Sequence, residues 1–205
     1  MVLLARNGWS TRDELDALAS FPADPEILVL AYCPNDVEGA ARAAGHEYAA
    51  DTGVHPAWLA PLVERSHLAN FLYWRLVRAG IGARTDDYFD WLGDALRDPE
   101  VARIHREEIL GIVAQARARG TRMVAILFPN ARDLEGSRAA LELAASTLRE
   151  ASVPVIDLGD RLVGRPVESL VVNESDAHPS VWVHEQAARL LAERIRPEPG
   201  VVAHP

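Results

Sequence analysis

The stretch Ile27-Leu-Val-Leu-Ala-Tyr32, which runs on into Cys33-Pro-Asn35-Asp36, decides the fold of this chain. Every residue from 27 to 32 is apolar or aromatic, without the alternation that is typical of a half-exposed strand. A continuous run of this kind predicts a strand buried on both faces, as in a parallel sheet. Asn35 and Asp36 follow Pro34 and are therefore expected at the carboxyl end of that strand.

Three other runs have the same character and are also predicted to be strands: Val2–Ala5, Met123–Phe128 and Val153–Leu158. Helical patterns fall between them. The segment Thr11-Arg-Asp-Glu14 has the form of a capping box, which predicts a helix that starts at Thr11. Further helices are predicted over Ser66–Ala79, Asp86–Leu96, Pro99–Arg119, Leu134–Glu150 and Ser180–Ile195. The alternation of strands and helices predicts an α/β fold, a three-layer α/β/α sandwich around a parallel sheet.

The chain has 205 residues, which is enough for one domain with a sizeable core. We expect that domain to cover residues 1–196, with residues 197–205 as a proline-broken tail. The long link between Tyr32 and Met123 predicts a helical insertion, at about 37–120, over the open end of the sheet.

The charge of the chain narrows its possible partners. All 21 cationic side chains are arginine, and 30 acidic residues bring the net charge to −9. Nucleic acid and anionic membrane surfaces both need a basic face, so this balance argues against them. No segment reaches the roughly 18 apolar residues of a membrane span. Residues 1–5 are too short for the core of a signal peptide, which predicts a cytoplasmic protein if Met1 is the genuine start and leaves secretion open otherwise.

The single cysteine, Cys33, excludes a disulfide framework and a cysteine metal site. We interpret it as a small, buried residue at the end of a strand. The histidines of the insertion, His46, His55 and His67, lie too far apart to share one helix face and lack the spacing of metal ligands. No cofactor and no metal are therefore expected.

The segment Asp176-Ala-His178-Pro179 lies between the last predicted strand and the last predicted helix. A carboxylate two residues before a histidine is typical of a base that is oriented by an acid, as in acyl transfer. Pro179 is suited to the first turn of a helix, which would place His178 at the helix amino terminus. The alternative is a purely structural histidine near a turn. His184, inside the helix, is expected to be packed.

Two other segments end predicted strands at the same edge of the sheet. The amide of Asn35 is able to donate to a developing oxyanion, and the alternative is an asparagine that only forms a turn. Gly8 allows close approach of the backbone to a ligand, and the alternative is a simple link between strand and helix. Ser10 is a candidate nucleophile, although a capping role for the following helix fits it better.

These segments together resemble blocks of the SGNH (GDSL-type) hydrolase family. Asn7-Gly8-Trp-Ser-Thr-Arg-Asp-Glu-Leu15 is similar to the glycine block, and Leu30-Ala-Tyr-Cys-Pro-Asn35-Asp36 is similar to the block that ends in Asn-Asp. Asp176-Ala-His178-Pro-Ser180, with His184 and Ala187 after it, resembles the last block and is the most specific of the three. The resemblance implies a flavodoxin-like parallel sheet and an esterase that works through an acyl-serine.

The resemblance also assigns roles. His178 would be the general base, Asp176 would fix its tautomer, and the Gly8 N–H and the Asn35 side chain would form the oxyanion hole. The substrate would be a small-molecule or carbohydrate ester. The family often places its aspartate three residues before the histidine, where this chain has Ser175.

The nucleophile of the family lies in a Gly-Asp-Ser block on the first strand, and residues 1–205 contain no such block. The resemblance therefore implies an N-terminally truncated copy in which the first strand is missing. In the flavodoxin-like order that strand is central, so Val2–Ala5 and Ile27–Tyr32 would each keep an unpaired edge. The alternatives are an O-acyltransferase of the same fold, a non-catalytic carbohydrate- or acyl-binding relative, and a plain α/β binding domain.

Overall fold

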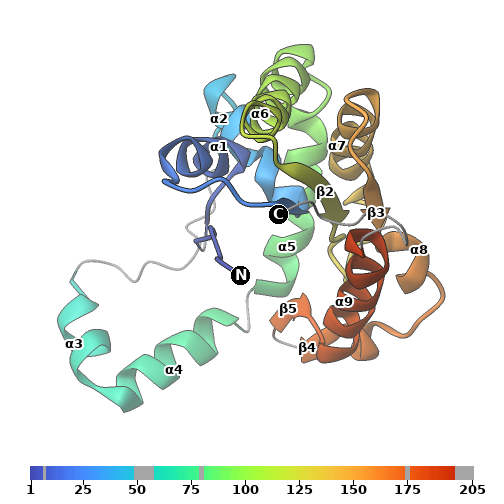
Figure 1. Ribbon diagram of the computed structural model, residues 1–205. Coiled ribbons are helices and arrows are strands. Elements are labelled where there is room, and N and C mark those ends of the chain that lie inside the picture. Colours follow the sequence, from blue (N-terminus) through green and yellow to red (C-terminus); the bar gives the residue numbers. More distant parts are fainter. Residues whose placement is uncertain (7, 49–57, 79–80, 174–175, 197–205) are drawn as a thin grey trace.

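The structure is a computed structural model that describes residues 1–6, 8–48, 58–78, 81–173 and 176–196. Its centre is a parallel sheet of three strands in the order β1-β2-β3, with β1 at Ile27–Tyr32, β2 at Arg122–Leu127 and β3 at Val155–Asp157 (Figure 1). The strands are in a simple register, in which Leu30 lies opposite Ala125 and Ala125 lies opposite Val155. The predicted parallel sheet is thus confirmed.

The bounds of the observed strands agree with the predicted ones to different degrees. β1 has the predicted bounds, and β2 begins one residue earlier than predicted. β3 is shorter because Val153 still belongs to the turn, where its N–H donates to the Leu148 carbonyl at 2.9 Å. The prediction of a strand at Val2–Ala5 is wrong, since these residues are irregular and largely exposed. A strand needs a hydrogen-bonded neighbour, and no described strand pairs with this apolar run.

Three helices cover one face of the sheet. They are α1 (Thr11–Ser20), α6 (Pro99–Ala118) and α7 (Arg138–Glu150). Their inward residues and one set of strand residues form a single apolar cluster, built around Leu18, Leu30, Tyr32, Ile109, Ile112, Val113, Ala125, Leu127, Leu141 and Leu148. α6 lies within the range that the sequence assigns to an insertion, yet it packs directly on the sheet as the connection from β1 to β2.

The opposite face of the sheet is covered by α8 (Gly159–Leu162) and α9 (Val181–Ile195). The apolar cluster on this side contains Val124, Ile126, Ile156, Leu158, Leu162, Leu170, Val171, Val183 and Ala187. Between α8 and α9 the chain forms a short helix, η2 (Val167–Ser169), and an antiparallel hairpin of β4 (Val171–Asn173) and β5 (Asp176–Pro179). Helices on both faces of a parallel sheet make the fold α/β, as predicted.

Two helix starts show how local chemistry sets the boundaries. α1 begins at Thr11 as predicted, but the predicted box of Thr11 and Glu14 is wrong. The Asp13 carboxylate instead accepts the Ser10 N–H at 2.8 Å and the Ser10 hydroxyl at 2.9 Å. At α9, Ser180 is the N-cap, and Pro179 ends β5 rather than opening the helix.

The remaining helices follow β1 in sequence. They are η1 (Pro34–Val37), α2 (Glu38–Ala43), α3 (Ala60–Arg65), α4 (His67–Arg78) and α5 (Ile81–Ala95). α2 and the end of α5 share an apolar cluster with the start of α6. α3 and α4 project away from the sheet and its covering helices (Figure 1).

β1 has an open edge. Its partner is β2, and no other described strand pairs with it. The Glu26 and Tyr32 carbonyls accept N–H groups from the β2 side, so the alternate residues Ile27, Val29 and Ala31 direct their backbone groups to the other edge. Val29 is 39% exposed and Ala31 is exposed as well. The sheet is therefore able to accept another strand beside β1.

Candidate functional site

Asp176 and His178 form a hydrogen-bonded pair on β5. Residues two apart on a strand place their side chains on the same face. The His178 Nδ1 lies 2.6 Å from Asp176 Oδ1, and the His178 backbone N–H donates to the same oxygen at 3.0 Å. The carboxylate is an acceptor, so it holds the neutral imidazole with its proton on Nδ1. The lone pair of Nε2 is then free to take a proton.

The imidazole of His178 faces solvent, because its side chain is 83% exposed. Among the described residues, no hydrogen bond is made by its Nε2. The pair is therefore an oriented and accessible base rather than a histidine fixed in the core. It stands on a strand, two residues before the Ser180 N-cap, whereas the sequence predicts it at the first turn of the helix.

Two contacts place this pair at the carboxyl end of the sheet. The guanidinium of Arg132, on the loop after β2, donates to the carbonyl of Asn173 at 3.0 Å. Asn173 is the cross-strand partner of Asp176. Phe128, the first residue after β2, has its ring centroid 6.1 Å from that of His184 on α9. Ligands of parallel α/β sheets bind at this edge.

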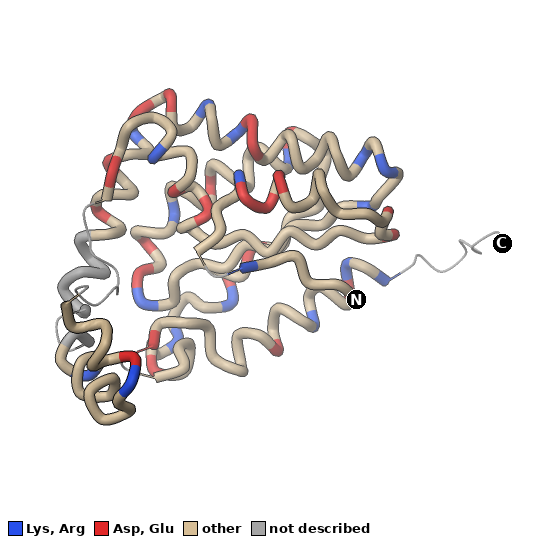
Figure 2. The backbone as a smooth tube through the Cα atoms, turned by 90° about the vertical axis from the view of Figure 1, so that its left-hand side faces the viewer, with Lys and Arg blue, Asp and Glu red and all other residues tan. Residues whose placement is uncertain are grey.

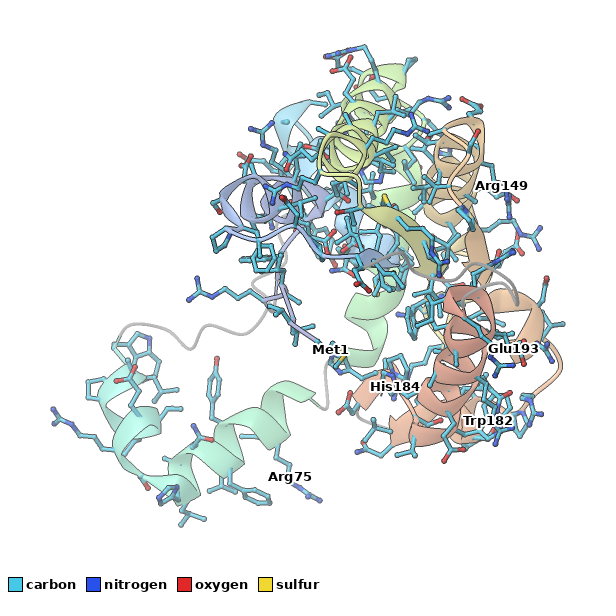
Figure 3. The ribbon with its side chains drawn as sticks, viewed as in Figure 1. Met1, Arg75, Arg149, Trp182, His184 and Glu193 are labelled. Atoms are coloured by element: carbon cyan, nitrogen blue, oxygen red, sulfur yellow. The ribbon has the colours of Figure 1, made fainter. Side chains whose placement is uncertain are left out.

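His184 and Trp182 mark the first turns of α9 in Figure 3, close to β5. The prediction that His184 lies within a helix is confirmed, but the prediction that it is packed is wrong, because its side chain is exposed. The ring contacts only the edge of the core through Phe128.

Asn35 lies in η1, directly after β1, and is exposed. The next residue holds the turn, because the Asp36 carboxylate accepts the Cys33 N–H at 2.7 Å. Asp36 is buried, and burial, followed by the nearby Glu14 carboxylate, raises its pKa well above the usual range. The Asn35 amide makes no hydrogen bond to the described part of the chain, and it is able to donate to a ligand.

Gly8 is exposed and has φ +78°, a left-handed conformation that favours glycine. Ser10 is buried and its hydroxyl is bonded to Asp13, so its capping role explains it fully. A Cβ on Gly39 would collide with the Ser10 side chain, which means that the start of α1 lies against the start of α2. The Gly8 segment and the Asn35 segment are therefore neighbours.

The structure thus brings one pair of the four candidate residues into contact and places the segments of the other two side by side. Asp176 is bonded to His178, and the segments of Gly8 and Asn35 adjoin through Ser10 and Gly39. Between these two groups, no hydrogen bond or ion pair is found among the described residues.

Sequence reasoning missed the proximity of two acidic side chains, Glu14 and Asp36, of which Asp36 directly follows Asn35. Burial, followed by the charge of Asp13, raises the pKa of Glu14 to about 7, and its Oε2 has no partner in the described structure. Burial likewise raises the pKa of Cys33 to about 12, so this thiol is not a nucleophile at neutral pH. The helical spacing of Thr11, Glu14 and Leu18 places Glu14 on the inward stripe of α1, and this signal was available in the sequence.

Other kinds of site were sought in the same structure. Within the ranges it describes, no three His, Cys, Asp or Glu side chains gather to hold a metal ion. Nor does any helix there have the length and hydropathy that crossing a membrane requires. No family model, no curated protein and no solved structure matches this chain.

Proposed function

We propose that this chain carries the acid–base pair and the oxyanion donors of an SGNH (GDSL-type) serine hydrolase that acts on ester bonds. The observation that carries the proposal is the bond between Asp176 and the His178 Nδ1, which leaves Nε2 accessible. The parallel order of β1, β2 and β3, with the pair and Asn35 at its carboxyl end, supports a flavodoxin-like sandwich of that family.

The chemistry assigned to these residues is acyl transfer through a serine. His178 Nε2 takes the hydroxyl proton as the serine oxygen attacks the ester carbonyl. The Gly8 N–H and the Asn35 amide donate to the oxyanion that forms. The protonated imidazole, held by Asp176, then gives its proton to the leaving alcohol. Water repeats the sequence in reverse to release the acid, and a sugar hydroxyl in place of water would make the same site an O-acyltransferase.

The serine is proposed to arrive on a further strand that pairs with the open edge of β1. Residues 1–205 contain no Gly-Asp-Ser, and Ser10 is occupied as a helix cap. Ile27, Val29 and Ala31 offer backbone donors and acceptors along that edge. A parallel strand there would end beside Asn35. We propose that a segment outside residues 1–205 supplies this strand.

A second function is favoured by one observation. The Ser10 hydroxyl is bonded to Asp13, and residues 1–205 contain no Gly-Asp-Ser. This favours a non-catalytic carbohydrate- or acyl-binding relative of the family. The two functions are distinguished by adding the proposed serine-bearing strand to the protein, because only the esterase requires it.

The experiment compares p-nitrophenyl acetate hydrolysis by residues 1–205 with hydrolysis by the same chain extended through the codons that precede Met1. We expect turnover with a burst of nitrophenol only in the extended protein, because only it supplies a serine to His178. An upstream reading frame without Gly-Asp-Ser, or an extended protein that binds esters but never acylates, would contradict the esterase and favour the binding relative.

A further inference from the structure

The hairpin of α3 and α4, residues 58–78, which we term the α3–α4 arm, has its apolar face in solvent. On α4, Leu68, Phe71, Leu72 and Leu76 follow one another at helical spacing and are between 47% and 76% exposed. Trp58 and Leu62, at the start of the arm, are also largely exposed. An amphipathic helix of a globular protein ordinarily turns such a stripe to the core.

This exposure is different from scattered surface leucines. Five of the six side chains lie on two consecutive helices, and Trp58 lies in the turn before them; this arm stands apart from the rest of the molecule (Figure 1). Val63, by contrast, is 2% exposed, so the arm has its own small interior and the apolar stripe lies outside it. A contiguous exposed apolar patch in a soluble chain marks an interaction surface.

The charge of the arm is opposite to that of the molecule. Residues 58–78 contain three arginines and one acidic residue, Glu64, in a chain with a net charge of −9. Acidic residues are distributed over the remainder of the chain, as the red segments of the backbone in Figure 2 show. Charges act over a Debye length of about 8 Å at physiological salt, so the local charge of the arm decides what it attracts. The charge of the whole chain, which argues against a membrane surface, conceals this local excess.

Arg75 combines the apolar character and the positive charge of the arm. Its guanidinium lies 5.9 Å from the ring centroid of Phe71, in line with the apolar stripe. Figure 3 shows Arg75 on the side of α4 that faces away from the sheet and its helices. The aliphatic stem of such an arginine follows the apolar face, while its guanidinium stays in water. This arrangement suits a lipid interface, where phosphodiester groups lie above the acyl chains.

We propose that the α3–α4 arm docks on an anionic phospholipid surface, with α4 in the plane of the headgroups. The exposed Leu and Phe side chains enter the acyl boundary, and the arginines meet the lipid phosphates. A protein partner would need a groove that fits the stripe, whereas a fluid lipid layer adapts to it. The proposal goes beyond the proposed esterase and uses neither His178 nor Asp176.

The test is co-sedimentation of the 205-residue chain with vesicles of phosphatidylcholine that contain about 30% phosphatidylglycerol. We expect binding that weakens with added salt and is lower on pure phosphatidylcholine. The double variant Phe71→Glu, Leu72→Glu should lower the partition coefficient at least about tenfold, since it removes apolar burial and adds repulsion. Arg75→Glu, which leaves the stripe intact, should lower it about five- to thirtyfold.

The matched control is Val163→Glu, because Val163 is 71% exposed but lies after α8, far from the arm in sequence. It should bind as the wild type does, and circular dichroism confirms that each variant is folded. Equal binding by the wild type and both arm variants, or no binding to anionic vesicles, would overturn the proposal. So would a dimer, found by sedimentation equilibrium, that the double variant dissociates, because a second copy would then cover the stripe.

Discussion

His178→Ala should lower ester turnover by about 10³-fold in the protein that is extended to include its serine. The loss comes from the proton transfer, because His178 is the imidazole that the Asp176 carboxylate holds. The fold should persist, since the His178 side chain is largely exposed. The measurement is kcat for p-nitrophenyl acetate, with the unfolding midpoint recorded alongside.

The control is His184→Ala, six residues further on. This imidazole is exposed as well, but it contacts Phe128 rather than a carboxylate, so turnover should stay close to the wild-type rate. Asp176→Asn should approach the effect of His178→Ala, because an amide that donates to Nδ1 selects the wrong tautomer. Equal turnover for the wild type and His178→Ala would remove the acid–base assignment.

The second large effect concerns Glu14, whose carboxyl is buried beside Asp36. Its pKa rises from 4.5 to about 7, chiefly through desolvation. The folded state therefore binds a proton that the unfolded state has released between these two values. Stability should fall as the pH rises through that window, and the contribution of Glu14 is on the order of 3 kcal/mol by pH 8.

Glu14→Gln is neutral at every pH and should remove this part of the decline. At pH 8 we expect the variant to be more stable than the wild type by roughly 1–3 kcal/mol, and at pH 4.5 the two should nearly coincide. Urea unfolding at both pH values measures the difference. The control Glu107→Gln changes an exposed carboxylate on α6, and its effect should be small at either pH. If Glu14→Gln were less stable than the wild type at pH 8, the folded state would be stabilising the ionised Glu14 carboxylate, which contradicts this prediction.

The sequence predicted the parts of this fold that local chemistry determines. The β1 run forms a strand that pairs with β2 and buries Leu30 and Tyr32 in the cluster under α6. The prediction that it is buried on both faces is wrong, because Val29 and Ala31 are exposed. The pairing of Asp176 with His178 was also predictable, because two residues that share a strand face are held at bonding distance by the backbone itself. The Asp176–His178 bond depends on neighbours in sequence, and the start and end of β1 follow from its own apolar run.

Features that depend on distant partners were predicted less well. The run Val2–Ala5 has strand composition, but composition does not supply the neighbour that a strand requires. The β4–β5 hairpin is too short to show an alternating pattern, and the sequence predicted a loop there. The burial of Glu14 follows from the packing of α1 near the end of β1. Whether the apolar stripe of α4 is covered likewise depends on other parts of the molecule, and the sequence of α4 alone does not show this.

The most direct test of the central claim is the protonation site of the His178 ring, read from ¹⁵N chemical shifts of the 205-residue chain at a pH where the imidazole is neutral. If Asp176 orients a base for proton transfer, the wild type carries its proton on Nδ1, and Asp176→Ala shifts it to Nε2, the form favoured by free histidine. A proton on Nε2 in the wild type, unchanged in Asp176→Ala, would show that the carboxylate does not hold the ring and that His178 is not the base proposed here.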